Sequence, residues 1–285
     1  MRNLPHLSKK INGNTLKVIA CIVMLIDHIA AGIMLPIVRD GLYDGMLSSA
    51  ELNMTYKVLR AIGRSAFPIF CFLLTEGFIH TRDKRRYAAG LLIFAIISEP
   101  FFDLTLYCKF DRYNFNIFKV LIENRELWFE RQNVFFTLFL GLVAIGHIDR
   151  IRAEFGRIMP LSETEDPRLT TVSGNVNIVS LLLSAAVGTS AAILAQFIHS
   201  DYRWYGVTLI IIFYVFKEFD ALCLAAGYFF ISSLSTEYWS FPAFILMLFY
   251  NKKRGRDLGK FKYCFYLFYP VHLLVIYLVR CIIAL

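Results

Sequence analysis

Long apolar runs follow one another along almost the whole of this 285-residue chain. A helix needs about 20 mostly apolar residues to cross the ~30 Å hydrocarbon core of a bilayer. Apolar residues make up 57% of the chain and charged residues 18%, against about 45–50% and about 25% in soluble proteins. This excess excludes a disordered chain, a disulfide scaffold and a soluble two-domain enzyme. We therefore predict an all-α, polytopic integral membrane helix bundle, with residues 1–285 forming one domain.

The hydropathy pattern predicts about nine transmembrane helices. The apolar runs are Thr15–Val38, Ile62–Ile79, Ala88–Tyr107, Asn133–Ile148, Asn175–Ile198, Trp204–Phe216, Phe219–Leu234, Ser240–Tyr250 and Tyr263–Leu285. The sixth to eighth runs are short for the bilayer core, and Ser240–Tyr250 is either a crossing or a re-entrant segment. A cleaved signal peptide is the alternative for the first run. Because Asp27 and His28 lie inside that run, we interpret it as a retained first helix.

The basic residues predict an orientation. With the N-terminus in the cytoplasm, 18 of the 30 Lys and Arg residues fall in inner segments, as the positive-inside rule requires. The inner segments are Met1–Asn14, His80–Tyr87, Asp149–Gly174, the Lys217-Glu218 turn and Asn251–Lys262. We therefore expect a multi-pass membrane protein with its N-terminus in the cytoplasm and its C-terminus outside. These short basic clusters signal topology, so the net charge of +8 does not indicate nucleic-acid binding.

Two connecting segments have a predicted structure of their own. Asp149–Gly174 is rich in charges and contains two prolines, which predicts a solvated cytoplasmic loop. Cys108–Gln132 lies on the outer side, and within it apolar and polar residues alternate in a pattern that predicts a helix on the membrane surface. Its apolar residues are Phe115, Ile117, Phe118, Leu121 and Ile122. The six cysteines fall singly, without a C-x-x-C pair, so we expect neither a metal site nor disulfides.

Seven ionisable residues lie inside the predicted helices, where each costs roughly 2.5 kcal/mol or more on insertion scales. They are Asp27, His28, Arg64, Glu76, Glu99, Asp103 and His272. One interpretation is that they form ion pairs that hold a bundle together. The other is that they form a functional site, and seven such groups exceed what packing requires.

The first helix carries a basic residue and a histidine at a spacing that places both on one helix face. Lys17 and His28 are eleven residues apart, which returns nearly to the same helix face at an axial distance of about 16 Å. An acyl-coenzyme A has a matching shape, with phosphates at one end and a thioester at the end of a pantetheine arm. Lys17 is then a phosphate ligand and His28 a general base; alternatively, Lys17 is only a positive-inside anchor. Asp27 projects about 100° away from His28, so it should meet a neighbouring helix, with Arg64 as the candidate partner.

Depth alone predicts that Arg64, Glu99 and Asp103 converge with Asp27 and His28 on the outer half of the bundle. Glu99 and Asp103 share one face of the third helix, beside Pro100, and Arg64 is expected near the outer end of the second helix, which Pro68 should kink. Asn133 is a helix N-cap or a polar lining group. In the last predicted helix, His272 either lines the site or stabilises a helix kink. Their sequence contexts are Ile62-Gly63-Arg64, Glu99-Pro100-Phe101-Phe102-Asp103, Asn133-Val134-Phe135-Phe136-Thr137 and Tyr269-Pro270-Val271-His272.

These contexts resemble the TraX family, and the similarity covers most of the chain in order. The matching segments are Leu16-Lys17-x-Ile19-Ala20, Asp27-His28-Ile29, Ile62-Gly63-Arg64-x-Ala66-Phe67-Pro68, Glu76-Gly77, Tyr87, Ser98-Glu99-Pro100-Phe101, Asn133-Val134-Phe135-Phe136-Thr137-Leu138, Gly141, Tyr202-x-x-Tyr205-Gly206, Lys262-Tyr263 and Tyr269-Pro270-Val271-His272-Leu273-Leu274. The resemblance implies an inner-membrane protein that acetylates the N-terminus of conjugative pilin. More distantly, the chain is similar to bacterial membrane O-acyltransferases, in which a basic residue and a histidine eleven positions later serve acyl transfer; these positions fall on Lys17 and His28.

We therefore expect a membrane acyltransferase, with acetyl-CoA or another acyl-CoA as co-substrate and without a metal. His28 is the expected base, Asp27 and Arg64 complete the catalytic set, and Lys17 binds the cofactor. The lining candidates are Glu76, Glu99, Asp103, Asn133 and His272. The expected partners are membrane lipid and an acceptor that is a pilin-like protein or a glycan. The alternatives are a proton-coupled transporter or flippase, whose buried acids and histidines relay protons, and a non-catalytic assembly factor.

Overall fold

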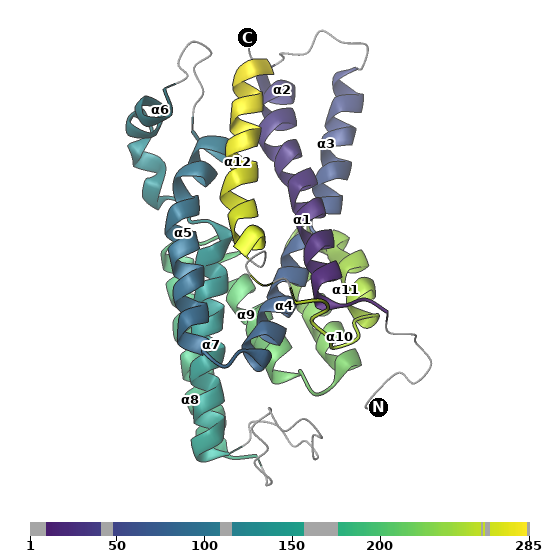
Figure 1. Ribbon diagram of the computed structural model, residues 1–285, viewed down its shortest axis with the longest axis vertical. Helices are drawn as coiled ribbons and strands as arrows, with labels where there is room; N and C mark the ends of the chain where they lie inside the picture. Colours follow the sequence, from purple (N-terminus) through teal and green to yellow (C-terminus); the bar gives the residue numbers. More distant parts are fainter. Residues whose placement is uncertain are drawn as a thin grey trace. The chain divides into compact units, whose positions relative to one another are not determined.

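The computed structural model describes residues 10–40, 48–108, 116–156, 176–257, 259 and 263–283. Within these ranges the protein is all-helical and has no β-strand, as predicted (Figure 1). The α-helices are α1 (Gly13–Ile29), α2 (Leu35–Asp40), α3 (Ser49–Gly63), α4 (Ala66–His80), α5 (Lys84–Leu106), α6 (Ile117–Glu123), α7 (Val134–Phe155), α8 (Ile178–Phe197), α9 (Arg203–Val215), α10 (Asp220–Ile231), α11 (Phe241–Leu248) and α12 (Cys264–Ile283). A π-helix, η1 (Ala30–Met34), joins α1 to α2, and two 3₁₀-helices, η2 (Arg125–Phe129) and η3 (Glu237–Ser240), precede α7 and α11.

Each of the nine predicted apolar runs contains a helix. Six helical stretches in the described ranges are long and apolar enough to cross a membrane: Gly13–Arg39, Ser49–His80, Lys84–Leu106, Val134–Phe155, Ile178–Phe197 and Cys264–Ile282. The helices α9 and α10 are apolar but shorter, with 13 and 12 residues. Helix α11 has 8 residues, which span about 12 Å. The sequence predicted that these three segments would be short, and the described part of the chain has six candidate membrane spans.

The chain divides into two compact units that alternate along the sequence. The larger pieces of unit 1 are Cys71–Ala95 and Arg131–Ile231. Unit 2 consists of Lys9–Phe70, Ile96–Glu130 and Ser232–Leu285. The boundaries fall inside α4 and α5, so the candidate site residues are distributed over both units.

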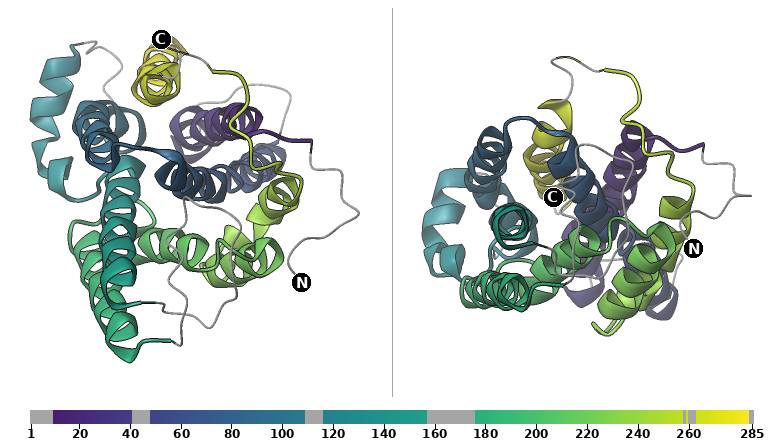
Figure 2. Two further views of the ribbon diagram at one scale, coloured as in Figure 1. Left: turned by 60° about the horizontal axis from the view of Figure 1, so that its bottom comes forward. Right: turned by 90° about the horizontal axis from the view of Figure 1, so that it is seen from below.

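In unit 1, α7, α8 and α9 pack against one another, and α10 packs on α9 (Figure 2). Gly141 on α7 permits a close approach to α9, because a Cβ atom there would collide with the Ile210 side chain. The start of α7 is tied to the turn before α9. Thr137 donates a hydrogen bond from its hydroxyl to the backbone oxygen of Asp201, and its Oγ1 lies 3.0 Å from Ser200 Oγ.

In unit 2, α1 packs against α3 on one side and against α12 on another (Figure 1). The π-helix η1 follows directly after Asp27-His28-Ile29 and widens the helix by one residue per turn there. Gly32 lies in this π-helix, and a Cβ at that position would be 2.7 Å from Ile276 Cγ2 and 3.0 Å from Thr105 Cγ2. This glycine therefore allows α5 and α12 to approach the π-helix closely.

Contacts within each unit join segments that the sequence placed on the same side of the membrane. In unit 1, Lys84 Nζ lies 2.7 Å from Asp149 Oδ2, and Arg152 lies 3.9 Å from Glu218, so three predicted inner segments meet. In unit 2, the backbone of Ile11 pairs with the segment that follows α11. These pairings agree with an alternating arrangement of helices, and which end faces the cytoplasm stays a prediction.

The structure corrects the predicted second helix. It begins at Ser49 rather than Ile62, because a capping box in which Ser48 and Glu51 bond reciprocally starts α3 thirteen residues earlier. Polar residues interrupt the apolar stripe of α3, so hydropathy alone does not reveal it. Arg64 therefore lies at the break between α3 and α4, directly after the last residue of α3, in the middle of the Ser49–His80 span instead of near the outer end of the second helix. The break precedes Pro68, which occupies the first turn of α4, where a missing N–H costs little.

Two predicted connecting segments are partly helical. Helix α7 continues to Phe155, so Asp149 belongs to a helix and not to a solvated loop; residues 157–175 lie outside the described residues. A helix is present in the predicted surface segment as α6, with Val120 buried and Phe118 and Ile122 exposed; its position on the membrane surface stays a prediction. Phe115 lies outside the described residues.

Candidate functional site

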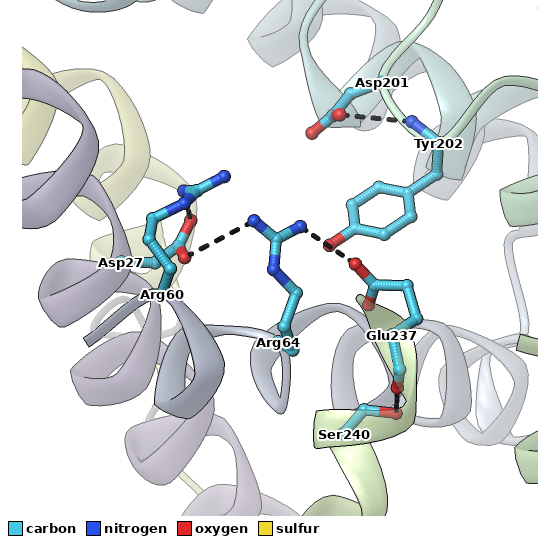
Figure 3. A network of polar contacts seen from close by, with 7 residues as sticks. All are labelled: Asp27, Arg60, Arg64, Asp201, Tyr202, Glu237 and Ser240. Atoms are coloured by element: carbon cyan, nitrogen blue, oxygen red, sulfur yellow. Dashed lines mark hydrogen bonds and ion pairs between the residues drawn. The ribbon is translucent and has the colours of Figure 1, made fainter. Parts of the chain in front are cut away.

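Two arginines and two carboxylates form an ion-pair network in unit 2 (Figure 3). Arg60 on α3 donates to Asp27 Oδ2 on α1 over 2.5 Å. Arg64, at the end of α3, lies 4.0 Å from Asp27 Oδ1 through one nitrogen and 2.8 Å from Glu237 Oε1 through another. Glu237 is only 2% exposed, and a buried carboxylate is stable when it is paired with a cation. Asp27 thus meets a neighbouring helix as predicted, and Arg60 is its shorter contact.

Gly63 makes this network possible. A Cβ atom at Gly63 would lie well inside van der Waals contact of the Asp27 side chain. The absence of a side chain therefore lets Asp27 lie directly against the last turn of α3, between Arg60 and Arg64. The network fixes α1 against α3 at the residue that precedes His28.

His28 points to a different helix from Asp27 and pairs with His272 on α12. Nδ1 of His28 lies 2.6 Å from Nε2 of His272. The two rings are inclined by 10° with their centroids 4.9 Å apart, as expected for two coplanar rings joined edge to edge by one hydrogen bond. The ring of Tyr269 packs edge-on against both imidazoles, at 5.9 Å and 5.6 Å. His272 is 5% exposed, and His28 is partly buried.

The partner of His272 determines the tautomers of this pair. Nδ1 of His272 lies 2.6 Å from the backbone oxygen of Phe268, and a carbonyl can only accept, so this nitrogen carries the proton. In the neutral ring Nε2 of His272 is then an acceptor, and Nδ1–H of His28 donates to it. Nε2 of His28 is left as the unprotonated nitrogen. The chain from Phe268 to His28 therefore orients one basic imidazole nitrogen.

Lys17 and His28 face the same helix, as their spacing predicted. The ammonium group of Lys17 lies 5.7 Å from the centroid of the Phe265 ring, in the first turn of α12. His28 contacts His272, seven residues further along α12. The two residues thus lie on the α12 side of α1, about 16 Å apart along its axis.

The other predicted site residues lie on α4, α5 and at the start of α7. Asp103 on α5 is 1% exposed, and Glu99 precedes it by one turn on the same helix. Asn133 belongs to unit 1 and caps α7: its side chain accepts from Phe135 N over 3.0 Å and donates to the Ala95 carbonyl over 2.8 Å. Glu76, also in unit 1, lies 3.7 Å from His80 on α4.

Comparison with known proteins identifies the family of this chain. The family model described as TraX protein matches residues 12–280. The chain belongs to the TraX family. It is also 31% identical over 278 residues to a protein of Dichelobacter nodosus named probable fimbrial assembly protein FimC, serogroup H1, with 90% of this chain and 91% of that protein covered. No solved structure matches the chain. The family assignment predicted from the sequence is thus confirmed, whereas a similarity to O-acyltransferases is not among the matches.

Several of the segments on which the resemblance was based meet at the two polar clusters. Asp27-His28 and Tyr269-Pro270-Val271-His272 meet at the histidine pair, and Ile62-Gly63-Arg64 meets Asp27 at the ion-pair network. Another family segment, at Tyr202, lies in unit 1, where Tyr202 has a left-handed backbone with φ 61° and its N–H donates to Asp201 (Figure 3).

Sequence reasoning missed Arg60 and Glu237. Arg60 precedes Arg64 by four residues, so a helix through both would have placed them on one face; the low hydropathy of α3 hid that helix. Glu237 lies in the short segment between the predicted apolar runs Phe219–Leu234 and Ser240–Tyr250. No sequence signal marks it, because its burial depends on how η3 packs against α3. No group of three or more His, Cys, Asp or Glu side chains in the described ranges is arranged to hold a metal ion.

Proposed function

We propose that this protein is a multi-pass acyltransferase of the bacterial inner membrane, with the N-terminus in the cytoplasm and up to nine crossings. It moves an acetyl or other acyl group from cytoplasmic acyl-CoA to an amine or hydroxyl. The observation that carries the proposal is the Phe268–His272–His28 chain, because it leaves Nε2 of His28 unprotonated and fixed in direction. A positioned general base contributes about 10²–10⁴-fold to the rate of such a reaction.

The transfer step uses this nitrogen. As the acceptor nitrogen or oxygen bonds to the thioester carbon, Nε2 of His28 takes the acceptor proton. The carbon–sulfur bond then breaks, and the imidazolium returns the proton to the leaving thiolate, which gives the acylated acceptor and free CoA. His272 is a positioning residue in this scheme, because it holds His28 in one tautomer in the way that the third member of a catalytic triad does.

The ion-pair network helps to keep Nε2 of His28 in position, because it holds α1 against α3 through Asp27, whose side chain leaves α1 in a different direction from His28. Asp27, Arg60, Arg64 and Glu237 hold α1 against α3 one residue from His28. We assign them a positioning role, since a misplacement of about 1 Å at a general base can cost about 10²-fold in rate. The relative named a probable fimbrial assembly protein supports a pilin-like subunit as the acceptor, and the α-amino group of such a subunit is the proposed nucleophile.

The test is transfer of labelled acetyl from acetyl-CoA by the purified protein. The acceptors are an apolar peptide with a free α-amino group and the same peptide with that group blocked. His28→Ala should reduce transfer at least 10²-fold, and His272→Ala should reduce kcat by about 10-fold or more and shift the pH–rate profile. His147→Ala is the matched control: Nδ1 of His147 also bonds to a carbonyl one turn back, at 2.9 Å from Val143, but this histidine is exposed on α7.

Three results would refute the proposal: full transfer by His28→Ala, equal losses in His272→Ala and His147→Ala, or equal labelling of free and blocked peptides. Substrate uptake into proteoliposomes driven by pH without any acyl donor would instead support a transporter.

A further inference from the structure

The segment after α11 is fastened to the start of α1, although the two are about 240 residues apart in sequence (Figure 2). Ile11 and Asn251 exchange backbone contacts in which Ile11 N donates to Phe249 and Asn251 N donates to Ile11, at 3.1 and 2.8 Å. Gly13 N then donates to the Lys253 oxygen over 2.9 Å. These bonds hold the segment in one place beside α1.

Further bonds extend the fastening into a basic loop of residues 252–256. Asn14 N donates to the Arg254 oxygen over 3.0 Å, and the Asn14 side chain donates to the Arg256 oxygen over 2.7 Å. The first N–H groups of α1 are therefore already used by backbone oxygens. In the basic loop, the side chains of Lys253, Arg254 and Arg256 are exposed and can reach a ligand.

The loop has a geometry that depends on glycine. Gly255 has φ +92°, a left-handed conformation that a residue with a side chain rarely adopts. A Cβ there would lie 2.7 Å from Asn12 Oδ1, the atom that caps α1. The basic loop therefore follows one defined path over the N-cap of α1. A cluster of basic residues that only sets the membrane orientation would need no such defined conformation.

The fastening places Arg254 against the first turn of α1, one helical turn before Lys17. A Cβ atom at Gly13 would lie 3.5 Å from the Arg254 Cα, and Gly13 precedes Lys17 by four residues on the same helix face, so two positive charges are brought to the same end of α1. Among the residues that the structure describes, neither side chain forms an ion pair with a carboxylate. An anion that binds between two neighbouring cations is stabilised by both, and a phosphate group carries the charge and the acceptor oxygens for this.

We propose that Lys17 and the basic loop of residues 252–256 form a phosphate-binding site, which takes the nucleotide phosphates of the acyl-CoA donor. The inference rests on the proposed function, because the donor is placed by the path from Lys17 to His28. The loop supplies Arg254 as the principal cation, from a part of the chain that the first helix does not reveal. The ligand chemistry is a phosphate ester, which an anionic lipid headgroup also presents, so the test separates the two sources.

The experiment measures binding of CoA, 3′-dephospho-CoA and pantetheine to the full-length protein in nanodiscs. The discs contain either neutral phosphatidylcholine alone or a mixture with phosphatidylglycerol. Arg254→Gln keeps the backbone oxygen that fastens the loop and should weaken CoA binding about tenfold, with no change for pantetheine. Arg85→Gln removes an exposed arginine from another predicted inner segment and should change nothing.

Gly255→Ala is a second variant that leaves every charge in place. It should weaken CoA binding as well, because the added Cβ displaces the loop from Asn12. Thermal unfolding of each variant shows whether the fold is retained. Equal affinity of wild type and Arg254→Gln for CoA, or an equal loss for CoA and pantetheine, would overturn the inference. So would a loss of CoA binding by Arg254→Gln that disappears in discs without phosphatidylglycerol, because the loop would then bind headgroups.

The outcome is independent of the transfer assay. If His28→Ala abolishes transfer while Arg254→Gln binds CoA normally, the phosphate site is wrong and the proposed function stands. If CoA binding depends on Arg254 but no acyl group is transferred, the phosphate site stands and the proposed chemistry is wrong.

Discussion

Substitution of Gly63 by alanine tests the contact between α1 and α3 on which the position of His28 depends. The added Cβ would overlap the Asp27 side chain, so the two helices must separate, and overpacking of this kind costs about 1–3 kcal/mol. Alanine is favoured over glycine in a helix interior by roughly 0.5–1 kcal/mol, which leaves a net destabilisation of about 1–2 kcal/mol. Gly90→Ala is the matched control, because a Cβ at Gly90 on α5 meets nothing within 4 Å.

The assay is thermal unfolding of both variants in the same detergent. Gly63→Ala should unfold below the wild type and Gly90→Ala at or above it, with a difference between the two variants of about 2 kcal/mol. With about 2–4 °C per kcal/mol, the two midpoints should differ by roughly 4–8 °C. Acetyl transfer should fall in Gly63→Ala alone. If the two variants unfold at the same temperature, Asp27 does not lie against Gly63 and the ion-pair network is not as described.

Three further predictions concern charge and burial. Burial and the nearby Arg152 lower the pKa of Lys217 to about 8, below its ordinary value of about 10.4. Between about pH 8 and pH 10.5 the unfolded chain therefore binds more protons than the folded chain, so stability should rise with pH in this range. Lys217→Met should flatten that rise in unfolding midpoints measured from about pH 8 to pH 10.5. Arg64→Met removes the arginine that pairs with the buried Glu237 and should destabilise the protein by about 3–5 kcal/mol. When Arg64→Met is combined with Glu237→Gln, more than half of the lost unfolding temperature should be recovered. No recovery would contradict the ion pair between Arg64 and Glu237. Burial and the neighbouring Asp103 raise the pKa of the Cys108 thiol to about 12, so maleimide at pH 8 should label the exposed Cys264 and leave Cys108 unmodified in mass spectra of the folded protein.

Much of the fold was predictable because hydropathy reports burial in lipid directly. All nine apolar runs contain helices, and the ends of most of them agree with the predicted runs within a few residues. The exceptions are the end of the fourth helix, which continues to Phe155, and above all the start of the second helix. The polar residues of α3 lower its hydropathy, while its start is determined by the reciprocal bonds of Ser48 and Glu51. A capping signature of this kind is visible in a sequence, so the same chain read for caps as well as hydropathy would have predicted a helix from Ser49.

The candidate site was predictable only where residues share a helix. Lys17 and His28 are eleven residues apart, so they lie on one face of the helix. Asp27 and His28 are adjacent in sequence, so their side chains point in directions about 100° apart. The partners across helices do not follow in this way, because hydropathy does not say which helices are neighbours. His272 was one of several lining candidates, and Arg60 and Glu237 were not candidates at all, although the structure brings all three into contact with predicted residues.

The direction of the basic nitrogen is the part of the site that depends most on tertiary structure. A histidine side chain alone has two nearly equivalent tautomers, and neither α1 nor α12 by itself selects one for His28. The selection begins at the Phe268 carbonyl, which imposes a proton on Nδ1 of His272, and it passes to His28 only because α12 lies close to the α1–π-helix junction. Gly32 permits that approach, since a Cβ there would meet Ile276 on α12. A bulkier residue at position 32 should therefore separate the two imidazoles and disturb the base without touching either histidine.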